Sequence, residues 1–281
     1  MNPTVLTLGH SYIRRLSNYC KMNRMSTNFG ITYINGIMYG KGGTKLCNMI
    51  QDHVFQRLIS KFSPTIVVLQ IGGKLKVEKQ LSLNKIGHAL HVLNPVFKKL
   101  TFDERIKAIA KSISLVDPVV CQSMYIFKQP GIGGEVIPHQ DATFLHTDPM
   151  KLFGIWIALE DAKEENGCLY FIPGSHKSGI YGNRRMIRNP DKSEGQPTCT
   201  FRGEVEKFDD NKWVPAPVKK GGLVLIHGEV VHKSEKNTSD QSRNIYTFHV
   251  FDQKNTKYSE ENWLQPSEAV PFTPLYDTSP E

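Results

Sequence analysis

Cysteine is scarce in this chain and follows no metal-binding or disulfide pattern. Five cysteines stand in 281 residues, and no two of them form a C-x-x-C pair. An odd number of scattered thiols argues against a disulfide framework and against a zinc knuckle. We therefore expect a protein of a reducing compartment, the cytoplasm. The five are Cys20, Cys47, Cys121, Cys168 and Cys199.

Long apolar runs are also missing. A helix that crosses a bilayer needs roughly 20 consecutive apolar residues, and no segment approaches that length. The opening residues lack the apolar core of a signal peptide. Hydrophobic content of 39% and charged content of 22% are ordinary for a globular protein. The sequence thus predicts no membrane span.

Acidic side chains are nearly absent from residues 1–76, which hold ten Lys or Arg but only Asp52, a charge of +9. The remaining residues hold 25 basic and 26 acidic side chains, a charge of −1. The basic excess is therefore local, and no Lys/Arg-rich run or aromatic-basic stacking motif accompanies it. We expect no nucleic-acid partner and a small-molecule substrate, and the composition leaves the oligomeric state open.

Residues 1–75 have the pattern of a partial α/β unit. The stretch TVLTLGHSYIRRL predicts a buried strand, a turn and a helix start, and PTIVVLQIGG predicts a second strand that ends in glycines. DHVFQRLISKF between them has helical spacing, and strand-helix-strand order is typical of a parallel α/β unit. These elements are too few to close such a fold. We expect a truncated and non-catalytic fragment.

Residues 77–281, which follow the polar stretch around IGGKLKVEKQ, have a different pattern. One short amphipathic helix, DERIKAIAKSISLV, precedes many short strands that are separated by Gly, Pro, Asn and Asp. Several strands alternate apolar and polar residues, as half-buried antiparallel strands do. We therefore expect a mainly β fold, a double-stranded β-helix (jelly roll) with flanking helices. Residues 177–210 show no clear strand and are predicted to form a surface insertion or a lid.

His139, Gln140 and Asp141 form an H-x-D motif. On an extended strand, side chains two residues apart point to the same face, so an imidazole and a carboxylate there can bind one cation. A histidine from a distant strand would complete a set of two histidines and one carboxylate. That set suits ferrous iron and leaves positions open for substrate and oxygen. The alternative is a polar strand end near solvent.

Two histidines, His227 and His232, compete to be the third ligand. Their odd spacing places them on opposite faces of a regular strand, so only one can point inward. Arg243 follows His232 after a turn through KNTSDQS, which would return the next strand alongside and favours His232. The guanidinium of Arg243 matches the fork geometry of a carboxylate. The alternative for Arg243 is a surface arginine at a turn.

From about residue 77 to the end, the chain resembles the phytanoyl-CoA dioxygenase family. The resemblance covers nearly three quarters of the chain and lies in NKIGHALH, QSMYIFKQP, GGEVIPHQDATFLHT, GIWIALEDAKEENGCLYFIPGSH, LVLIHGEVVHKS and ENWLQP. It implies an Fe(II)- and 2-oxoglutarate-dependent dioxygenase, which uses O2 to convert 2-oxoglutarate into succinate and CO2. It also implies hydroxylation of a small-molecule or acyl substrate, with ascorbate as a supporting reductant.

The resemblance also implies residue roles. His139, Asp141 and His232 match the iron ligands, Arg243 matches the partner of the far carboxylate of 2-oxoglutarate, and Ser234 assists that pairing. Lys85 matches a second basic residue at the cosubstrate, and Met124 and Trp156 match lining positions, with core packing as the alternative. Gln122 and Tyr125 are weaker candidates for the same pocket. Independently of the resemblance, the Gly-Ser turn after the strand in ENGCLYFIPGSH could place His176 at the barrel mouth against substrate, with a capping role in the turn as the alternative.

The first 75 residues resemble the opening blocks of SGNH-type hydrolases, with Ser11 in GHS at the nucleophile position. Gly73-Lys74-Leu75 replaces the expected Asn-Asp block, and the late histidine block is absent. A serine without a base stays unactivated. Two alternatives to an active oxygenase therefore remain. One is a catalytically silent jelly-roll binding protein, because the fragment replaces the family's helical lead-in, and the other is a serine hydrolase that uses Ser11.

Overall fold

The structure is a computed structural model that describes residues 4–9, 35–40, 66–70 and 84–276, except 192, 194 and 269. The chain divides into two compact units, residues 1–86 and 87–281. The first unit holds a parallel sheet in the order β2-β1-β3, which agrees with the predicted α/β pattern. Ser11, the helix expected in DHVFQRLISKF and Gly73-Lys74-Leu75 lie outside the described residues. The strands are β1 (Thr4–Gly9), β2 (Asn35–Gly40) and β3 (Ile66–Gln70).

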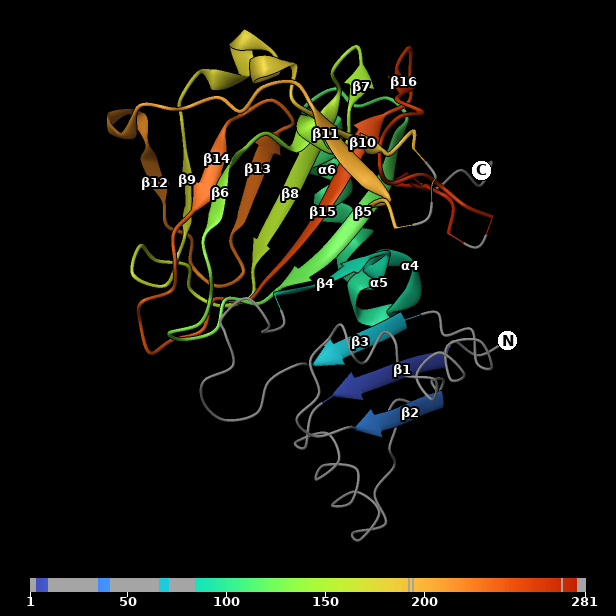
Figure 1. Cartoon of the computed structure of the whole chain (residues 1–281), viewed down its shortest axis with the longest axis vertical. Helices are drawn as coiled ribbons and strands as arrows, with labels where there is room; N and C mark the ends of the chain where they lie inside the picture. The colour runs from blue at the N-terminus through green and yellow to red at the C-terminus, as the bar shows by residue number, and fades with distance from the viewer. Residues whose placement is uncertain are drawn as a thin grey trace, which may run out of the picture. The chain divides into compact units, whose positions relative to one another are not determined.

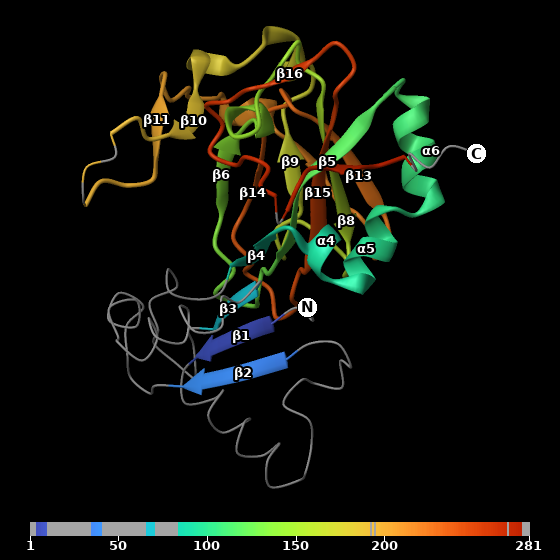
Figure 2. The ribbon, with the colours of Figure 1, turned by 90° about the vertical axis from the view of Figure 1, so that its right-hand side faces the viewer.

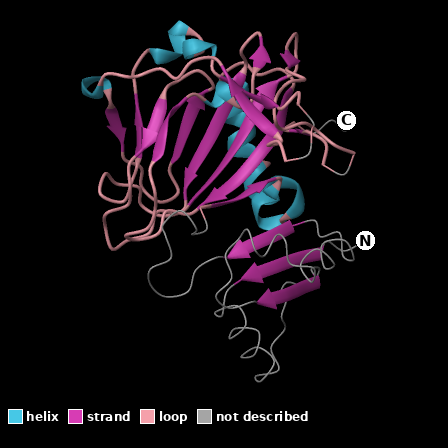
Figure 3. Ribbon diagram, viewed as in Figure 1, coloured by secondary structure: helices cyan, strands magenta, loops and turns pink. Residues whose placement is uncertain are grey.

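The second unit is built on two sheets, and strands dominate it (Figures 1 and 3). The larger sheet has the order β13-β8-β15-β5-β17, with β4 also paired to β5, and the smaller has the order β12-β9-β14-β6. The strand pairs β13–β8, β8–β15, β15–β5 and β5–β17 are antiparallel, as are all three pairs of the smaller sheet. This is the jelly roll that the sequence predicts.

The larger sheet contains β4 (Lys85–His88), β5 (Pro118–Ile126), β8 (Leu152–Ala158), β13 (Leu223–His227), β15 (Ile245–Asp252) and β17 (Thr273–Pro274). The smaller contains β6 (Val136–His139), β9 (Leu169–Phe171), β12 (Val214–Ala216) and β14 (His232–Ser234). Short elements complete the unit: β7 (Thr147–Asp148), β16 (Lys257–Tyr258), and the 3-10 helices η2 (Asp141–Thr143), η3 (Ser175–Ser178), η4 (Tyr181–Asn183) and η5 (Asp210–Lys212).

Three helices flank the larger sheet, as Figure 2 shows. They are α4 (Leu90–Leu93), α5 (Pro95–Thr101) and α6 (Glu104–Ser112). Asn94 caps α5 and Asp103 caps α6, because each side chain accepts backbone N–H groups of the first turn. In the part of the chain that the structure describes, no helix is both long and apolar enough to cross a bilayer.

Every residue of the central strand β15 is buried, so its two faces meet different partners. Tyr246 faces the helices, where its hydroxyl lies 2.6 Å from Thr101 Oγ1 and its ring stacks on Phe97 at 4.5 Å. Thr247 and His249 alternate with it and face the space between the sheets. An antiparallel strand covered on both sides needs no polar face, which is why its sequence shows little alternation.

Two local predictions were wrong. Residues 177–210 are not strand-free, because β10 (Arg185–Arg188) and β11 (Cys199–Arg202) form an antiparallel hairpin there. The stretch from 221 to 232 is not one strand either. β13 ends at His227 in the larger sheet, and β14 begins at His232 in the smaller one. A turn at 228–230 lets the chain change sheets, so the face-alternation argument between the two histidines does not apply.

Candidate active site

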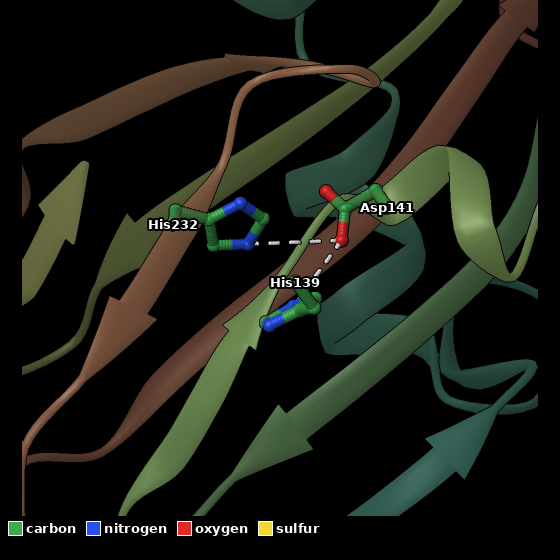
Figure 4. Close-up of side chains that lie close together, drawn as sticks. All are labelled: His139, Asp141 and His232. Atoms are coloured by element: carbon green, nitrogen blue, oxygen red, sulfur yellow. Dashed lines mark ion pairs between the residues drawn. The ribbon is translucent and has the colours of Figure 1, made fainter. Parts of the chain in front are cut away.

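Three residues with metal-binding side chains meet where β6, η2 and β14 come together (Figure 4). His139 ends β6, Asp141 begins η2, and His232 begins β14 directly opposite His139 in the antiparallel register. Asp141 therefore does not lie on the strand, as the H-x-D argument assumes. The chain turns after His139, and the carboxylate reaches the imidazoles from the first residue of the 3-10 helix.

The ligand atoms of these residues all lie within 4.8 Å of one another. His139 Nε2 and His232 Nε2 are each 3.7 Å from the same oxygen, Asp141 Oδ1. Two imidazole nitrogens and one carboxylate oxygen around a common point are the ligand set of non-haem ferrous sites. The donor chemistry of the three residues fits a ferrous ion.

Backbone carbonyls set which imidazole nitrogen is free. His139 Nδ1 lies 2.8 Å from the carbonyl oxygen of Ile137, and His232 Nδ1 lies 3.1 Å from that of Val230. A carbonyl oxygen can only accept, so each Nδ1 carries the proton and donates it. Each Nε2 is then left with a lone pair that faces Asp141, which is the tautomer a metal requires.

His249 contacts the other oxygen of Asp141, with its Nε2 3.1 Å from Oδ2. Oδ1 alone is therefore turned toward His139 and His232, and the carboxylate is set to bind a cation through one oxygen. Burial acts to raise the pKa of Asp141. The hydrogen bond from His249, and the positive charge that His249, His232 and His139 carry when protonated, outweigh burial and hold the pKa well below its usual range. Asp141 is an anion at neutral pH.

Gly154 provides the space for this pair. It lies beside His249 in the β8–β15 register, and a Cβ atom there would stand 3.1 Å from Asp141 Oδ2 and 3.4 Å from His249 Nε2. Contacts that close would make Asp141 or His249 shift. Gln122 on β5 completes this row of the sheet.

The next row holds Met124, Thr247 and Trp156, on β5, β15 and β8. Met124 and Trp156 are both buried, and the guanidinium carbon of Arg243 lies 5.5 Å from the centre of the Trp156 ring. The structure thus places Trp156 against Arg243, with Met124 one strand further along the row. The lining roles of Met124 and Trp156 stay predictions.

Arg243 is almost completely buried, with 2% of its surface exposed, so it is not a surface arginine at a turn. Its Nε donates to the carbonyl of Gly167 at 3.0 Å, and its Nη2 lies 3.4 Å from Ser234 Oγ. Burial lowers the pKa of Arg243 to about 10, so the guanidinium is charged at neutral pH. The structure brings Arg243 and Ser234 together, as the family resemblance implies.

A second buried cation, Lys128, shares the same serine. Lys128 Nζ donates to Ser234 Oγ at 2.7 Å and to the carbonyl of Glu235, and only 1% of the residue is exposed. Burial, and then the neighbouring charge of Arg243, lowers the pKa of Lys128 to about 7. Among the described residues, no carboxylate lies within ion-pairing distance of either cation.

Other candidate residues lie elsewhere. Tyr125 differs from the expectation, because it lies on the opposite face of β5 from Met124 and packs 6.0 Å from Phe97 of α5. His227 packs against Phe153 and His176, at 5.4 Å from each ring, and is not part of the His139 cluster. Lys85 begins β4 at the first, partly exposed position of the strand, and burial around its ammonium lowers its pKa. The proposed roles of Lys85 and His176 stay predictions.

Sequence reasoning missed two residues. His249 carried no expected role, since a lone histidine in an apolar strand is more often structural, and only strand register places it against Asp141. Lys128 follows the apolar strand in YIFKQP, where a lysine usually marks a solvent-facing strand end. Nothing in the linear pattern distinguishes either residue from its ordinary counterpart.

The chain is similar to known proteins over this unit. The family model described as phytanoyl-CoA dioxygenase (PhyH) matches residues 63–245. Phytanoyl-CoA dioxygenase domain-containing protein 1 of Danio rerio is 58% identical over 205 residues, which are 73% of this chain and 69% of the relative. The protein of the same name from Rattus norvegicus is 57% identical with the same coverage. A homolog from Caenorhabditis elegans is 53% identical over 73% of this chain and 71% of its own length.

Solved structures share the fold at low sequence identity. The non-heme monooxygenase ThoJ in its apo form matches 68% of this chain and 65% of its own, with a TM-score of 0.53 and 18% identity. The non-heme alpha ketoglutarate dependent epimerase SnoN from nogalamycin biosynthesis matches 83% of this chain and 90% of its own, with a TM-score of 0.51 and 16% identity. Both likenesses support the jelly-roll architecture.

Proposed function

The chain belongs to the phytanoyl-CoA dioxygenase family, and we propose that it oxidatively decarboxylates 2-oxoglutarate at a ferrous site formed by His139, Asp141 and His232. By class it is a 2-oxoglutarate-dependent non-haem iron dioxygenase. The observation that carries the proposal is the convergence of these three ligand atoms within 4.8 Å, next to a buried arginine and serine.

When bound, a ferrous ion would supply the oxygen chemistry of this class, which couples loss of CO2 from 2-oxoglutarate to oxidation of a second substrate. The chain's own residues prepare the site for it. The carbonyls of Ile137 and Val230 hold His139 and His232 in the ligand tautomer. His249 holds Asp141 so that one oxygen remains free.

Arg243 and Ser234 would hold the far carboxylate of 2-oxoglutarate. The guanidinium already donates through Nε to Gly167, which fixes its plane and leaves donors on the terminal nitrogens. A buried, charged guanidinium with no acidic partner among the described residues requires an anion to offset its desolvation. The Trp156 ring beside it excludes water from one side of the pocket.

We expect the primary substrate to reach the site from the side of His139, whose side chain is 20% exposed against 8% for His232. Phe144 packs 5.9 Å from the His139 ring, and Phe201, which is 46% exposed, packs 6.3 Å from Phe144. Aromatic side chains beside the more open ligand favour a small molecule or acyl compound with an apolar part. We propose that such a substrate is hydroxylated.

The test is consumption of 2-oxoglutarate and release of succinate by the purified protein with Fe(II), O2 and ascorbate. His139→Ala and Asp141→Ala should each abolish turnover, because either change removes a ligand. Asp240→Asn, which neutralises an exposed aspartate in a turn, is the matched control and should keep wild-type rates. Equal turnover in wild type and both alanine variants would reject the site.

Arg243→Met should weaken 2-oxoglutarate binding by about 2–5 kcal/mol, the usual cost of removing one partner of a buried charge pair. The KM for 2-oxoglutarate measures this, and an unchanged KM would show that the carboxylate binds elsewhere. Metal analysis separates the proposal from the silent binding protein, since a wild type that binds no iron and forms no succinate would favour the latter.

A further inference from the structure

Lys128 takes no part in the function proposed so far, yet its position is closely defined. Its backbone carbonyl accepts the N–H of Arg243 at 3.0 Å and the side-chain amide of Asn237 at 2.9 Å. Its side chain runs past two glycines. A Cβ on Gly133 would stand 2.5 Å from Lys128 Cγ, and one on Gly167 would stand 2.7 Å from Cδ. The Lys128 side chain therefore packs closely against two positions where a larger residue would not fit.

Lys128 and Arg243 both contact the side chain of Ser234. Ser234 Oγ accepts from Lys128 Nζ at 2.7 Å and lies 3.4 Å from Arg243 Nη2. A hydroxyl oxygen has two lone pairs and one hydrogen. When Lys128 and Arg243 both donate to Ser234 Oγ, the two lone pairs of that oxygen are occupied. The hydroxyl hydrogen is then available to an acceptor. Because an ammonium can only donate, Lys128 makes the Ser234 hydroxyl act as a donor.

Among the described residues, no carboxylate forms an ion pair with Lys128. The nearby acids are already engaged, since Glu235 pairs with Lys233 at 2.8 Å and Glu135 lies 4.0 Å from Lys236. Within the described part of the chain, Lys128 and Arg243 have no carboxylate partner. Two buried cations around one hydroxyl form a site that is complete only with an anion.

We propose that Lys128 is a positioning residue for the far carboxylate of 2-oxoglutarate, which it serves by turning the Ser234 hydroxyl toward that carboxylate and by adding a second positive charge to the pocket. The inference rests on the proposed function, because it takes 2-oxoglutarate as the ligand. It follows that the pocket selects keto acids that carry a second carboxylate.

The experiment is an anaerobic calorimetric titration of the Fe(II)-loaded protein with 2-oxoglutarate and with 2-oxobutyrate, which lacks the far carboxylate. Lys128→Met keeps the length of the side chain and removes its charge and donors. We expect its affinity for 2-oxoglutarate to fall about 10- to 100-fold, the size of one hydrogen bond to a charged group. Affinity for 2-oxobutyrate should stay within a factor of about two to three, since that ligand makes no such bond.

Ser234→Ala completes a double-mutant cycle. If Lys128 acts through the serine, its loss should cost much less in the Ser234→Ala background than in the wild type. Lys219→Met, which changes an exposed lysine that pairs with Asp161 at 3.0 Å, is the matched control and should bind like the wild type. Fully additive losses would show that Lys128 does not act through the serine and would overturn that part of the inference. Equal losses for both keto acids would show that Lys128 only supports the fold and would overturn the whole inference.

A second measurement needs no variant. Burial and the charge of Arg243 lower the pKa of Lys128 from the usual value of a lysine to about 7. Glu235, Cys168 and Glu135 act in the opposite direction but do not outweigh them. The ammonium is present below that pH and is lost above it. The KM for 2-oxoglutarate should therefore rise as the pH increases from 7 to 8.5, and Lys128→Met should flatten that rise.

The outcomes separate the two claims. A wild type that does not bind 2-oxoglutarate at all would overturn the proposed function together with this inference. A wild type that binds 2-oxoglutarate with a KM independent of pH, and a Lys128→Met variant of equal affinity, would overturn only the role of Lys128.

Discussion

At the scale of single residues, the least expected contact is that of His249 with Asp141. A carboxylate with two equivalent oxygens can bind a metal through one or both. His249 Nε2, 3.1 Å from Oδ2, removes that freedom and leaves Oδ1 for the cation. Because partners of metal ligands orient them and adjust their basicity, we expect His249 to contribute to metal affinity without binding the metal.

His249→Phe should lower the affinity for Fe(II) about 10- to 100-fold, the usual loss when a ligand's partner is removed. Phenylalanine keeps the ring and loses the donor. His249→Gln restores an N–H group and should recover part of the affinity. Competition with a chelator measures both variants. If the phenylalanine variant bound iron like the wild type, the contact would be incidental.

At the scale of elements, Gln140 joins the segments around His139, Asp141 and His232. It lies between His139 and Asp141 and is 3% exposed. Its Nε2 donates to the carbonyls of Gly179 at 2.8 Å and Glu229 at 2.6 Å, and its Oε1 accepts the N–H of Tyr181 at 2.9 Å. One side chain thus connects the end of β6, the loop around η4 and the turn before β14.

Gln140→Leu should lower the free energy of unfolding by about 2–4 kcal/mol, because it leaves three part-buried backbone groups, at Gly179, Tyr181 and Glu229, without their partner. It should also weaken iron binding, since the turn that leads to His232 loses its hydrogen bond to the residue that follows His139. Urea unfolding gives the first value and chelator competition the second. Gln241→Leu, at an exposed position, is the control. Equal stability of the two variants would contradict this role.

At the scale of the whole molecule, a titratable side chain is buried where the helices pack on the larger sheet. His91 of α4 is 2% exposed, and its Nδ1 lies 2.7 Å from Ser123 Oγ on β5. Burial lowers the pKa of His91 to about 4, well below the 6.5 of an exposed histidine. The folded protein therefore holds this imidazole neutral, and acid must charge it where the sheet and the helices meet.

Stability should therefore fall as the pH decreases. The folded pKa of His91 is below the unfolded one, so its contribution is complete above pH 6.5 and is lost as the pH falls toward 4, by about 3 kcal/mol at most. Burial lowers the pKa of His146 in the same direction. Urea midpoints between pH 7 and 4.5 measure the slope. His91→Gln should make it shallower, and an unchanged slope would assign the effect to other groups.

The residue pattern alone predicted the architecture and grouped His139, Asp141 and His232 as one candidate metal site. Short alternating strands can bury their apolar face only in paired antiparallel sheets. The H-x-D motif, with a histidine and an arginine further along the chain, can be recognised in the sequence alone. Asp141 shows where local reasoning ends. The two-residue spacing correctly brought it to His139, but through a turn into a 3-10 helix and not along one strand.

The other contacts of the site depend on the register between strands far apart in the chain, which only the folded protein sets. His232 contacts His139 since β14 pairs with β6, whereas His227 belongs to the other sheet. His249 reaches Asp141 across the space between the two sheets. Lys128 contacts Ser234, which is 106 residues away in the chain, inside the folded protein, where both side chains are buried. Lys128 and His249 differ from ordinary lysines and histidines only because they are buried in the folded protein, and the linear sequence does not show which side chains will be buried.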